Sequence, residues 1–205
     1  MDAARSTLLV LEAKFERLVH SRARAIQHEH QSHGRTAPAA TKRPAQAEIE
    51  HDPERSFREA LETFPAAAYT TDSAGRITSF NRSAVDLWGR APELGKSQWC
   101  GSWKLYRLDE QRLPHDMCPM AVALKEDRAV RGERAVAERP DGRRVPFLAY
   151  PTPLHDANGA LVGAVNMLLD VTGHEDELES SAHPRAKFRS RANRLHARAS
   201  KGQVS

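Results

Sequence analysis

The chain has 205 residues, with 31 Lys and Arg against 27 Asp and Glu, which gives a formal net charge of +4. A hydrophobic content of 40% and a mean hydropathy of −0.64 are typical of a water-soluble protein with polar extensions, and no apolar run approaches the roughly 20 residues that cross a bilayer. The apolar run at residues 8–11 is too short for a signal-peptide core, which predicts a cytoplasmic protein without membrane contact. Two cysteines are too few for a disulfide framework and predict free thiols.

The first segment, residues 1–30, is expected to form an amphipathic helix. Within residues 3–27, apolar side chains recur at spacings of three and four, with a gap at Arg22; they are Leu8, Leu11, Phe15, Leu18 and Ala25. A single helix cannot bury such a stripe alone. Two alternatives follow: the stripe pairs with its twin in a second chain, which we favour and which predicts a homodimer, or it docks on its own chain.

Residues 31–52 have the composition of a linker, rich in Ala, Pro and Thr with basic residues. Asp52 followed by Pro53 is a strong helix start, because Asp caps free backbone N–H groups and Pro fits the first turn. The predicted helix ends before Pro65 and carries on one face the apolar residues Phe57, Leu61 and Phe64.

A β-hairpin followed by a short helix is predicted next. Asp72–Gly75 has turn chemistry, since Asp bonds nearby backbone and Gly accepts a positive φ, and residues 68–71 and 76–80 on either side have strand character. Asn81 is the expected N-cap of the short helix and Gly89 its C-terminal stop.

Another helix is expected after an aromatic-rich loop. Trp99, Trp103 and Tyr106 in that loop are expected to close the core from the loop side. Asp116 is the predicted helix cap, with Pro119 still inside the first turn. The buried stripe of this helix is predicted at Met117, Met120, Ala121 and Leu124.

Three strands are predicted at residues 129–138, 144–154 and 161–171, with tight turns between them. The prolines of the second strand cannot donate to a ladder, so that strand should be interrupted or lie at an edge. Together with the hairpin, this order predicts an α+β fold: a five-stranded antiparallel sheet with short helices on one face, plus the N-terminal amphipathic helix.

This succession of elements resembles the PAS domain family over residues 57–172. The hairpin, Asn cap, short helix and Gly stop resemble the opening of a PAS domain, and Asp170-Val171-Thr172 matches the family's terminal Asp-x-Thr signature. The resemblance implies a sensory PAS domain at residues 53–172, in which Asp170 and Thr172 relay the signal by tying the sheet to a following helix.

Residues 173–205 depart from the common PAS pattern. Only a short acidic helix fits at residues 175–179, and no kinase, cyclase or helix-turn-helix segment follows, so we expect a sensor without a covalently attached output. From residue 182 onward the tail has seven Lys or Arg and no acid, and it is expected to be disordered. The expected partner is a signalling protein such as a histidine kinase or response regulator of a two-component system. The alternative is a nucleic-acid-associated regulator that uses the basic tail.

The resemblance also implies a ligand pocket between the sheet and the helices. In the family, the residue two before the terminal Asp faces this cavity, and the alternation along a strand adds its neighbours. The implied pocket residues are Tyr69, Met117, Met120, Leu124, Phe147, Ala149, Ala164, Asn166 and Leu168. Asn166 needs a hydrogen-bond partner on an otherwise apolar wall, either a ligand or a neighbouring side chain or water.

The sequence leaves the cofactor unknown. Some PAS oxygen sensors bind haem through a histidine on the helix beside the cavity, so His115 and Cys118 are candidate haem ligands and a haem-based redox or gas sensor is an alternative function. Flavin is not expected, because blue-light PAS relatives carry a reactive Cys in an Asn-Cys-Arg-Phe stretch just after a Gly, and here Cys100 is displaced among other neighbours. We expect neither a metal site nor an enzyme, since phosphate loop, nucleophile elbow and metal-ligand spacing are missing.

Overall fold

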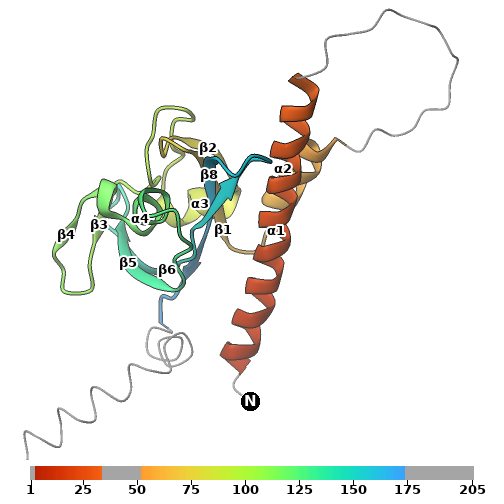
Figure 1. Ribbon diagram of the computed structural model, residues 1–205. Coiled ribbons are helices and arrows are strands. Elements are labelled where there is room, and N and C mark those ends of the chain that lie inside the picture. Colours follow the sequence, from red (N-terminus) through yellow and green to blue (C-terminus); the bar gives the residue numbers. More distant parts are fainter. Residues whose placement is uncertain (1–2, 34–51, 174–205) are drawn as a thin grey trace, which may run out of the picture.

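The computed structural model describes residues 3–33 and 52–173 (Figure 1). Most of the predicted linker, the acidic segment and the basic tail lie outside the described residues. The helices are α1 (Ala3–His33), α2 (Pro53–Glu62), α3 (Arg82–Trp88) and α4 (Pro119–Lys125), with a short 3-10 helix η1 (His115–Met117). The strands are β1 (Ala67–Asp72), β2 (Ile77–Phe80), β3 (Lys104–Tyr106), β4 (Arg112–Leu113), β5 (Glu133–Glu138), β6 (Arg144–Ala149), β7 (Thr152–His155) and β8 (Leu161–Asp170).

The strands of the described residues form one antiparallel sheet. Its order is β2-β1-β8-β6-β5-β3-β4, and β7 pairs with β8 as well. This confirms the α+β fold with an antiparallel sheet, but the sheet has eight strands where five were expected. The last long strand, β8, lies in the middle of the sheet, between β1 and β6.

The three additional strands have two causes. Residues 104–113 form the β3-β4 hairpin, which pairs with β5 and extends the sheet beyond the expected edge. Pro151 divides the strand expected at 144–154 into β6 and β7, which confirms the predicted interruption. The strand expected at 129–138 begins only at Glu133, because Gly132 before it has a positive φ of 66°.

The hairpin and its helix follow the local chemistry of the sequence. The Asp72 carboxylate oxygen Oδ1 accepts hydrogen bonds from the backbone N–H groups of Ala74 and Arg76 at 3.0 and 2.9 Å, which closes the turn between β1 and β2. Asn81 caps α3 by accepting from the Ala84 N–H at 3.0 Å, and Gly89 ends it with a left-handed φ of 69°. These predictions are confirmed.

Asn81 also joins three elements. Its Oδ1 accepts a second hydrogen bond from the Ala68 N–H of β1 at 3.0 Å. Its amide Nδ2 donates to the end of α2 and the segment after it, at the carbonyls of Leu61, Phe64 and Ala66, 2.8–3.3 Å away. Asn81 therefore fixes the end of α2 and the start of α3 to the start of β1.

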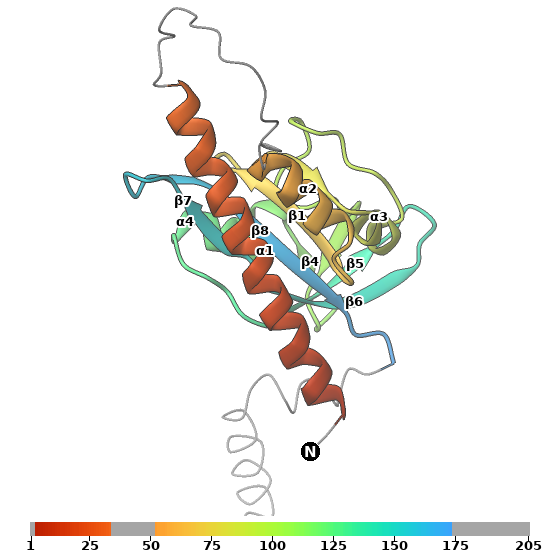
Figure 2. The ribbon, with the colours of Figure 1, turned by 90° about the vertical axis from the view of Figure 1, so that its right-hand side faces the viewer.

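The sheet has a helical layer on each face. Residues of α3 and α4 pack with one face in an inner cluster that includes Leu87, Trp88, Met120 and Leu124. Residues of α1 and α2 pack with the other face in an outer cluster, and Figure 2 shows α1 lying across the sheet beside α2. The short helices α3 and α4 thus lie on one face, as expected, and α2 covers the outer face together with α1.

The N-terminal helix docks on its own chain, the second of the two alternatives considered. Its buried stripe comprises Leu8, Phe15, Leu18, Ala25 and Ile26, and it contacts α2 and β7. Arg22, the gap in the apolar pattern, forms an ion pair with Glu54 of α2, and its guanidinium lies 5.0 Å from the centroid of the Phe57 ring. The stripe is therefore used within the chain, and homodimerisation stays a prediction. None of the described helices has the length and apolar character needed to span a membrane.

The start of α4 differs from the prediction. Asp116 lies in η1 and is not the cap; Cys118 occupies the N-cap position without a side-chain hydrogen bond, and Pro119 is the first residue of α4. Cys118 is extended, with φ −69° and ψ 163°, and this break turns Met117 away from the core. The expectation that Met117 belongs to the buried stripe is wrong, since it is 53% exposed.

Candidate functional site

The inner face of the sheet brings the pocket residues expected from the sequence together, with Met117 excluded. Tyr69, Met120, Leu124, Phe147, Ala149, Ala164 and Leu168 belong to a single buried cluster. Asn166 is buried beside them, and its neighbours Val165 and Met167 on β8 face the outer cluster. The sequence therefore predicted correctly which residues of β8 face the inner cluster and which face the outer cluster.

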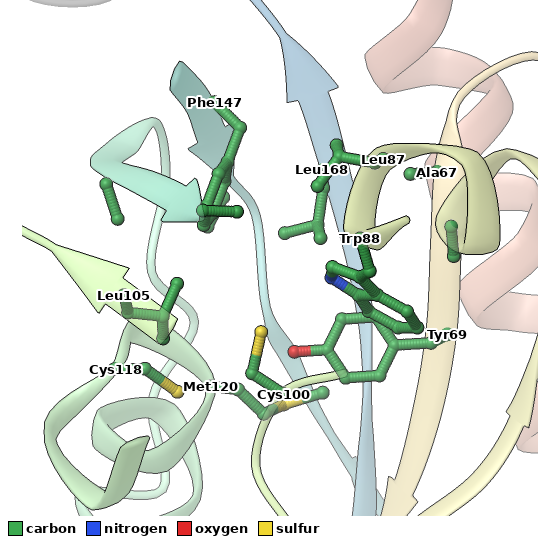
Figure 3. Close-up of a cluster of buried hydrophobic side chains, with 14 of the residues drawn as sticks. Ala67, Tyr69, Leu87, Trp88, Cys100, Leu105, Cys118, Met120, Phe147 and Leu168 are labelled. Carbon is green, nitrogen blue, oxygen red and sulfur yellow. The ribbon is translucent and has the colours of Figure 1, made fainter. Parts of the chain in front are cut away.

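Several side chains at the centre of this cluster were not among the pocket residues expected from the sequence. Trp88 of α3 is fully buried and packs edge-to-face on Tyr69, with ring centroids 5.1 Å apart. Leu105, Cys100 and Cys118 complete the cluster, and Figure 3 shows the two cysteines and Met120 gathered at one end, toward which the Tyr69 hydroxyl points. Trp88 could have been found from the sequence, because it lies four residues after Ala84 on the buried face of α3.

Asn166 finds its partners within the protein. Its Oδ1 accepts a hydrogen bond from the Tyr150 N–H at 3.0 Å, and its Nδ2 donates to the Tyr69 hydroxyl oxygen at 3.2 Å. The Tyr69 hydroxyl in turn donates to the carbonyl of Trp99 at 2.8 Å. This polar chain crosses the inner cluster from β8 through β1 to the loop that closes the cluster.

The loop residue Trp99 adopts an unusual backbone conformation. Its φ is 65°, a left-handed value that costs a non-glycine residue about 1–3 kcal/mol. Its N–H donates to the Gly75 carbonyl at 2.7 Å, and its ring lies so close to Gly75 that an added Cβ there would be 2.3 Å from a ring atom. Trp99 thus closes the core as predicted, whereas Trp103, 43% exposed, does not.

The ionisable groups of the cluster are held in their neutral forms. Burial raises the pKa of the Cys118 thiol to about 12, and the neighbouring Cys100 adds to this shift. Burial likewise raises the pKa of Cys100, whose Sγ lies 3.0 Å from the Ser102 hydroxyl, and raises the pKa of Tyr69 well above its ordinary value. Thiolate chemistry at neutral pH is disfavoured by this environment.

The two candidate haem ligands do not form a suitable donor pair. The Cys118 sulfur lies inside the side-chain cluster, and its raised pKa opposes the thiolate that iron ligation needs. The His115 ring nitrogen Nε2 is 2.9 Å from the Ser102 carbonyl oxygen, so it already has a hydrogen-bond partner. Among the described residues, no group of three or more His, Cys, Asp or Glu side chains is placed to hold a metal ion.

The Asp-x-Thr triplet closes β8 locally. The Asp170 Oδ1 accepts hydrogen bonds from the Thr172 N–H at 2.9 Å and from the Thr172 hydroxyl at 2.6 Å. Val171 between them is buried in the outer cluster. The chain beyond Gly173, where the sequence places the helix that would receive the signal, lies outside the described residues.

A family model described as the PAS fold matches residues 61–176. Similar solved structures include a PAS domain from Colwellia psychrerythraea, 19% identical over 58% of this chain and 98% of that chain with a TM-score of 0.42, and the PAS domain of Bordetella pertussis BvgS, 18% identical over 71% and 99% with a TM-score of 0.40. A PAS domain from the fruit-fly ELK potassium channel is 14% identical over 58% and 97%, with a TM-score of 0.46. A comparison with curated protein sequences finds no match.

Proposed function

The chain belongs to the PAS family, and from this premise we propose that it is a sensory and signal-transduction module. It binds a small ligand or a partner protein at its inner cluster and relays the change through its terminal helices. Cytoplasmic location, a homodimeric state and a partner of the two-component type, such as a histidine kinase or response regulator, are parts of this proposal.

The observation that supports the proposal is the two-sided packing of β8. Leu168 packs in the inner cluster, while the adjacent Met167 packs in the outer cluster that contains the stripe of α1. Because consecutive side chains of one strand touch both clusters, a change in packing that shifts β8 on the inner side alters the surface on which α1 rests.

Of the two helices on the outer face, α1 is the better candidate for the moving element. The end of α2 is fixed to the sheet by the three carbonyl contacts of Asn81. The attachments of α1 include its apolar stripe, the ion pair between Arg22 and Glu54 and the contact of the Arg22 guanidinium with the Phe57 ring. A shift of β8 is therefore more easily accommodated by α1 than by α2.

Trp88 supplies a group that a ligand in the inner cluster would use. Its indole nitrogen Nε1 is buried and has no hydrogen-bond partner of normal geometry among the described residues. It lies near the Cys100 thiol and lowers the pKa of that thiol, against the larger raising effect of burial. An acceptor atom placed beside it would gain a hydrogen bond without breaking a well-formed one, and such an unmade bond is rare in folded proteins. Binding would then relay a signal only to the extent that it favours one packing of β8 and α1 over another.

Hydrogen exchange of the full-length chain, followed by mass spectrometry, tests the relay. The variant Leu168→Val trims the inner side of β8, and the matched control Leu105→Val makes the same change in the same cluster on β3. We expect faster amide exchange in α1 for Leu168→Val than for Leu105→Val at equal loss of global stability. Equal exchange of α1 in both variants would contradict a relay through β8.

Native mass spectrometry and an absorption spectrum of freshly purified protein test what the module binds. A bound mass without a visible chromophore is the expected result for a small ligand, and a Soret band would instead support the haem alternative. The native mass spectrum also gives the number of subunits.

A further inference from the structure

A groove of about 340 Å³ lies between α1 and the end of α2, away from the inner cluster. From α1 it is lined by Lys14, Arg17 and Leu18, and from the end of α2 onward its lining includes Thr63, Phe64 and Pro65. Its floor is apolar, because Leu18 and Phe64 are buried in the outer cluster. None of the pocket residues expected from the sequence lines it.

The described lining of this groove carries two positive charges and no negative one. The charged residues in it are Lys14 and Arg17, and both are exposed. Their spacing of three places them side by side on α1, where like charges repel each other. Within residues 3–33 and 52–173, neither side chain has a hydrogen-bond or ion-pair partner. An anionic partner would therefore relieve a repulsion that the described part of the chain leaves in place.

The chain leaves the described structure near this groove. Pro65, which lines the groove, also lines a second hollow together with Asp170 at the end of β8. Val171 is buried in the same outer cluster as Phe64, and Gly173, the last described residue, follows two positions later. Six residues of extended chain reach up to about 20 Å. The residues after Gly173 therefore begin within reach of the groove.

The sequence after Gly173 has the charge that the groove lacks. Residues 174–181 read His-Glu-Asp-Glu-Leu-Glu-Ser-Ser, with four carboxylates and no Lys or Arg, and they lie outside the described residues. Leu178 supplies an apolar side chain among the acidic ones. Because the segment is tethered to β8, its effective concentration at the groove is on the order of millimolar, so weak ion pairs suffice to populate the contact.

We propose that residues 174–179 dock in the groove between α1 and α2, with their carboxylates on Lys14 and Arg17 and with Leu178 on the apolar floor. The contact needs no ligand in the inner cluster, and it goes beyond the function proposed above. The docked segment holds α1 against the end of β8. High salt, which screens exposed ion pairs, loosens this hold.

Paramagnetic relaxation enhancement in the full-length, ¹⁵N-labelled protein tests the contact. A nitroxide is attached to the variant Ser181→Cys, and the two native cysteines are buried. We expect the label to broaden the amide signals of Arg17, Thr63 and Phe64, and about 0.5 M NaCl to reverse this broadening. Equal broadening at low and high salt, or the strongest broadening on another surface, would overturn the proposal.

Charge reversal on α1 tests which side chains hold the segment. Arg17→Glu should lower the docked fraction by about two- to fivefold, the order expected for one exposed ion pair. The matched control Arg24→Glu reverses another exposed arginine two turns further along α1 and should leave the broadening unchanged. Equal effects of the two variants would contradict docking in the groove.

A charge swap separates electrostatic docking from damage to α1. The double variant Lys14→Glu/Arg17→Glu should lose the broadening. Adding Lys at the four acidic positions, Glu175, Asp176, Glu177 and Glu179, restores opposite charges with their sides exchanged. We expect the swapped protein to regain the broadening at α1 and α2. A swapped protein that keeps the circular dichroism of wild type without regaining the broadening would rule the contact out.

Discussion

Asn166 and Tyr69 lie directly opposite each other on β8 and β1, and the Asn166 amide donates to the Tyr69 hydroxyl at 3.2 Å. The pair is buried on the inner face of the sheet, where a polar group without a partner would be costly. Because the Tyr69 hydroxyl also donates to the carbonyl of the strained Trp99, this one contact joins the central strand to the loop over the core.

Removal of the Tyr69 hydroxyl should destabilise the fold. In Tyr69→Phe the Asn166 amide and the Trp99 carbonyl both lose a buried partner, so we expect the free energy of unfolding to fall by about 1–3 kcal/mol in urea denaturation. Tyr150→Phe is the matched control, since the Tyr150 hydroxyl is buried without a partner among the described residues and its loss should be neutral or stabilising. Equal effects of the two variants would contradict the polar chain.

Gly101 should not tolerate a side chain. A Cβ at this position would lie 2.3 Å from the Trp88 ring, so Gly101→Ala should cost about 1–3 kcal/mol of stability by overpacking. Trp88→Phe removes part of the ring that the new methyl group would meet, and the double variant should therefore lose less stability than the sum of the single variants. Strict additivity in the urea-unfolding free energies would show that the two residues do not clash.

The buried thiols should make the fold sensitive to alkaline pH. Burial raises the pKa of Cys118 from 9 to about 12, so the unfolded chain releases this proton before the folded chain does. The resulting stability is fully present below about pH 9 and is lost as the pH rises toward about 12. Chemical denaturation across this range should show a shallower loss for Cys118→Ala than for wild type, and identical slopes would contradict the shift.

A homodimer, if it forms through α1, should depend on the residues that the intramolecular docking leaves exposed. Leu9 and Val10 are 59% and 55% exposed on α1. The double variant Leu9→Glu/Val10→Glu should shift sedimentation velocity profiles toward monomer, because it places two charges in the contact. Leu94→Glu, at a leucine 53% exposed on a loop, is the control and should leave the dimer intact. A dimer that survives the double variant would place the contact elsewhere.

The parts of the fold set by neighbouring residues could be predicted from the sequence. The Asp72 turn, the Asn81 cap and the Gly89 stop depend on groups a few residues away, and each forms as expected. The inner position of Leu168 followed from the period of a strand together with the family pattern, and the structure agrees.

Contacts between distant segments could not be predicted in the same way. The pattern of α1 shows an apolar stripe but not the surface it meets, and the ion pair of Arg22 with Glu54 appeared as a gap. Met117 has the spacing of a buried residue, and only the extended Cys118 after it turns its side chain outward. The partners of Asn166 are far away in the sequence, so the residue itself left open whether a ligand or a protein group would bind its amide.

The β3-β4 hairpin changes how the sheet ends. The hairpin pairs with β5 through β3, so one border of the sheet is β4, a strand of only two residues. The opposite border is β2, a strand of four residues. Short borders offer few unpaired backbone groups to a strand from another molecule. The added hairpin therefore leaves a border that disfavours edge-to-edge polymerisation.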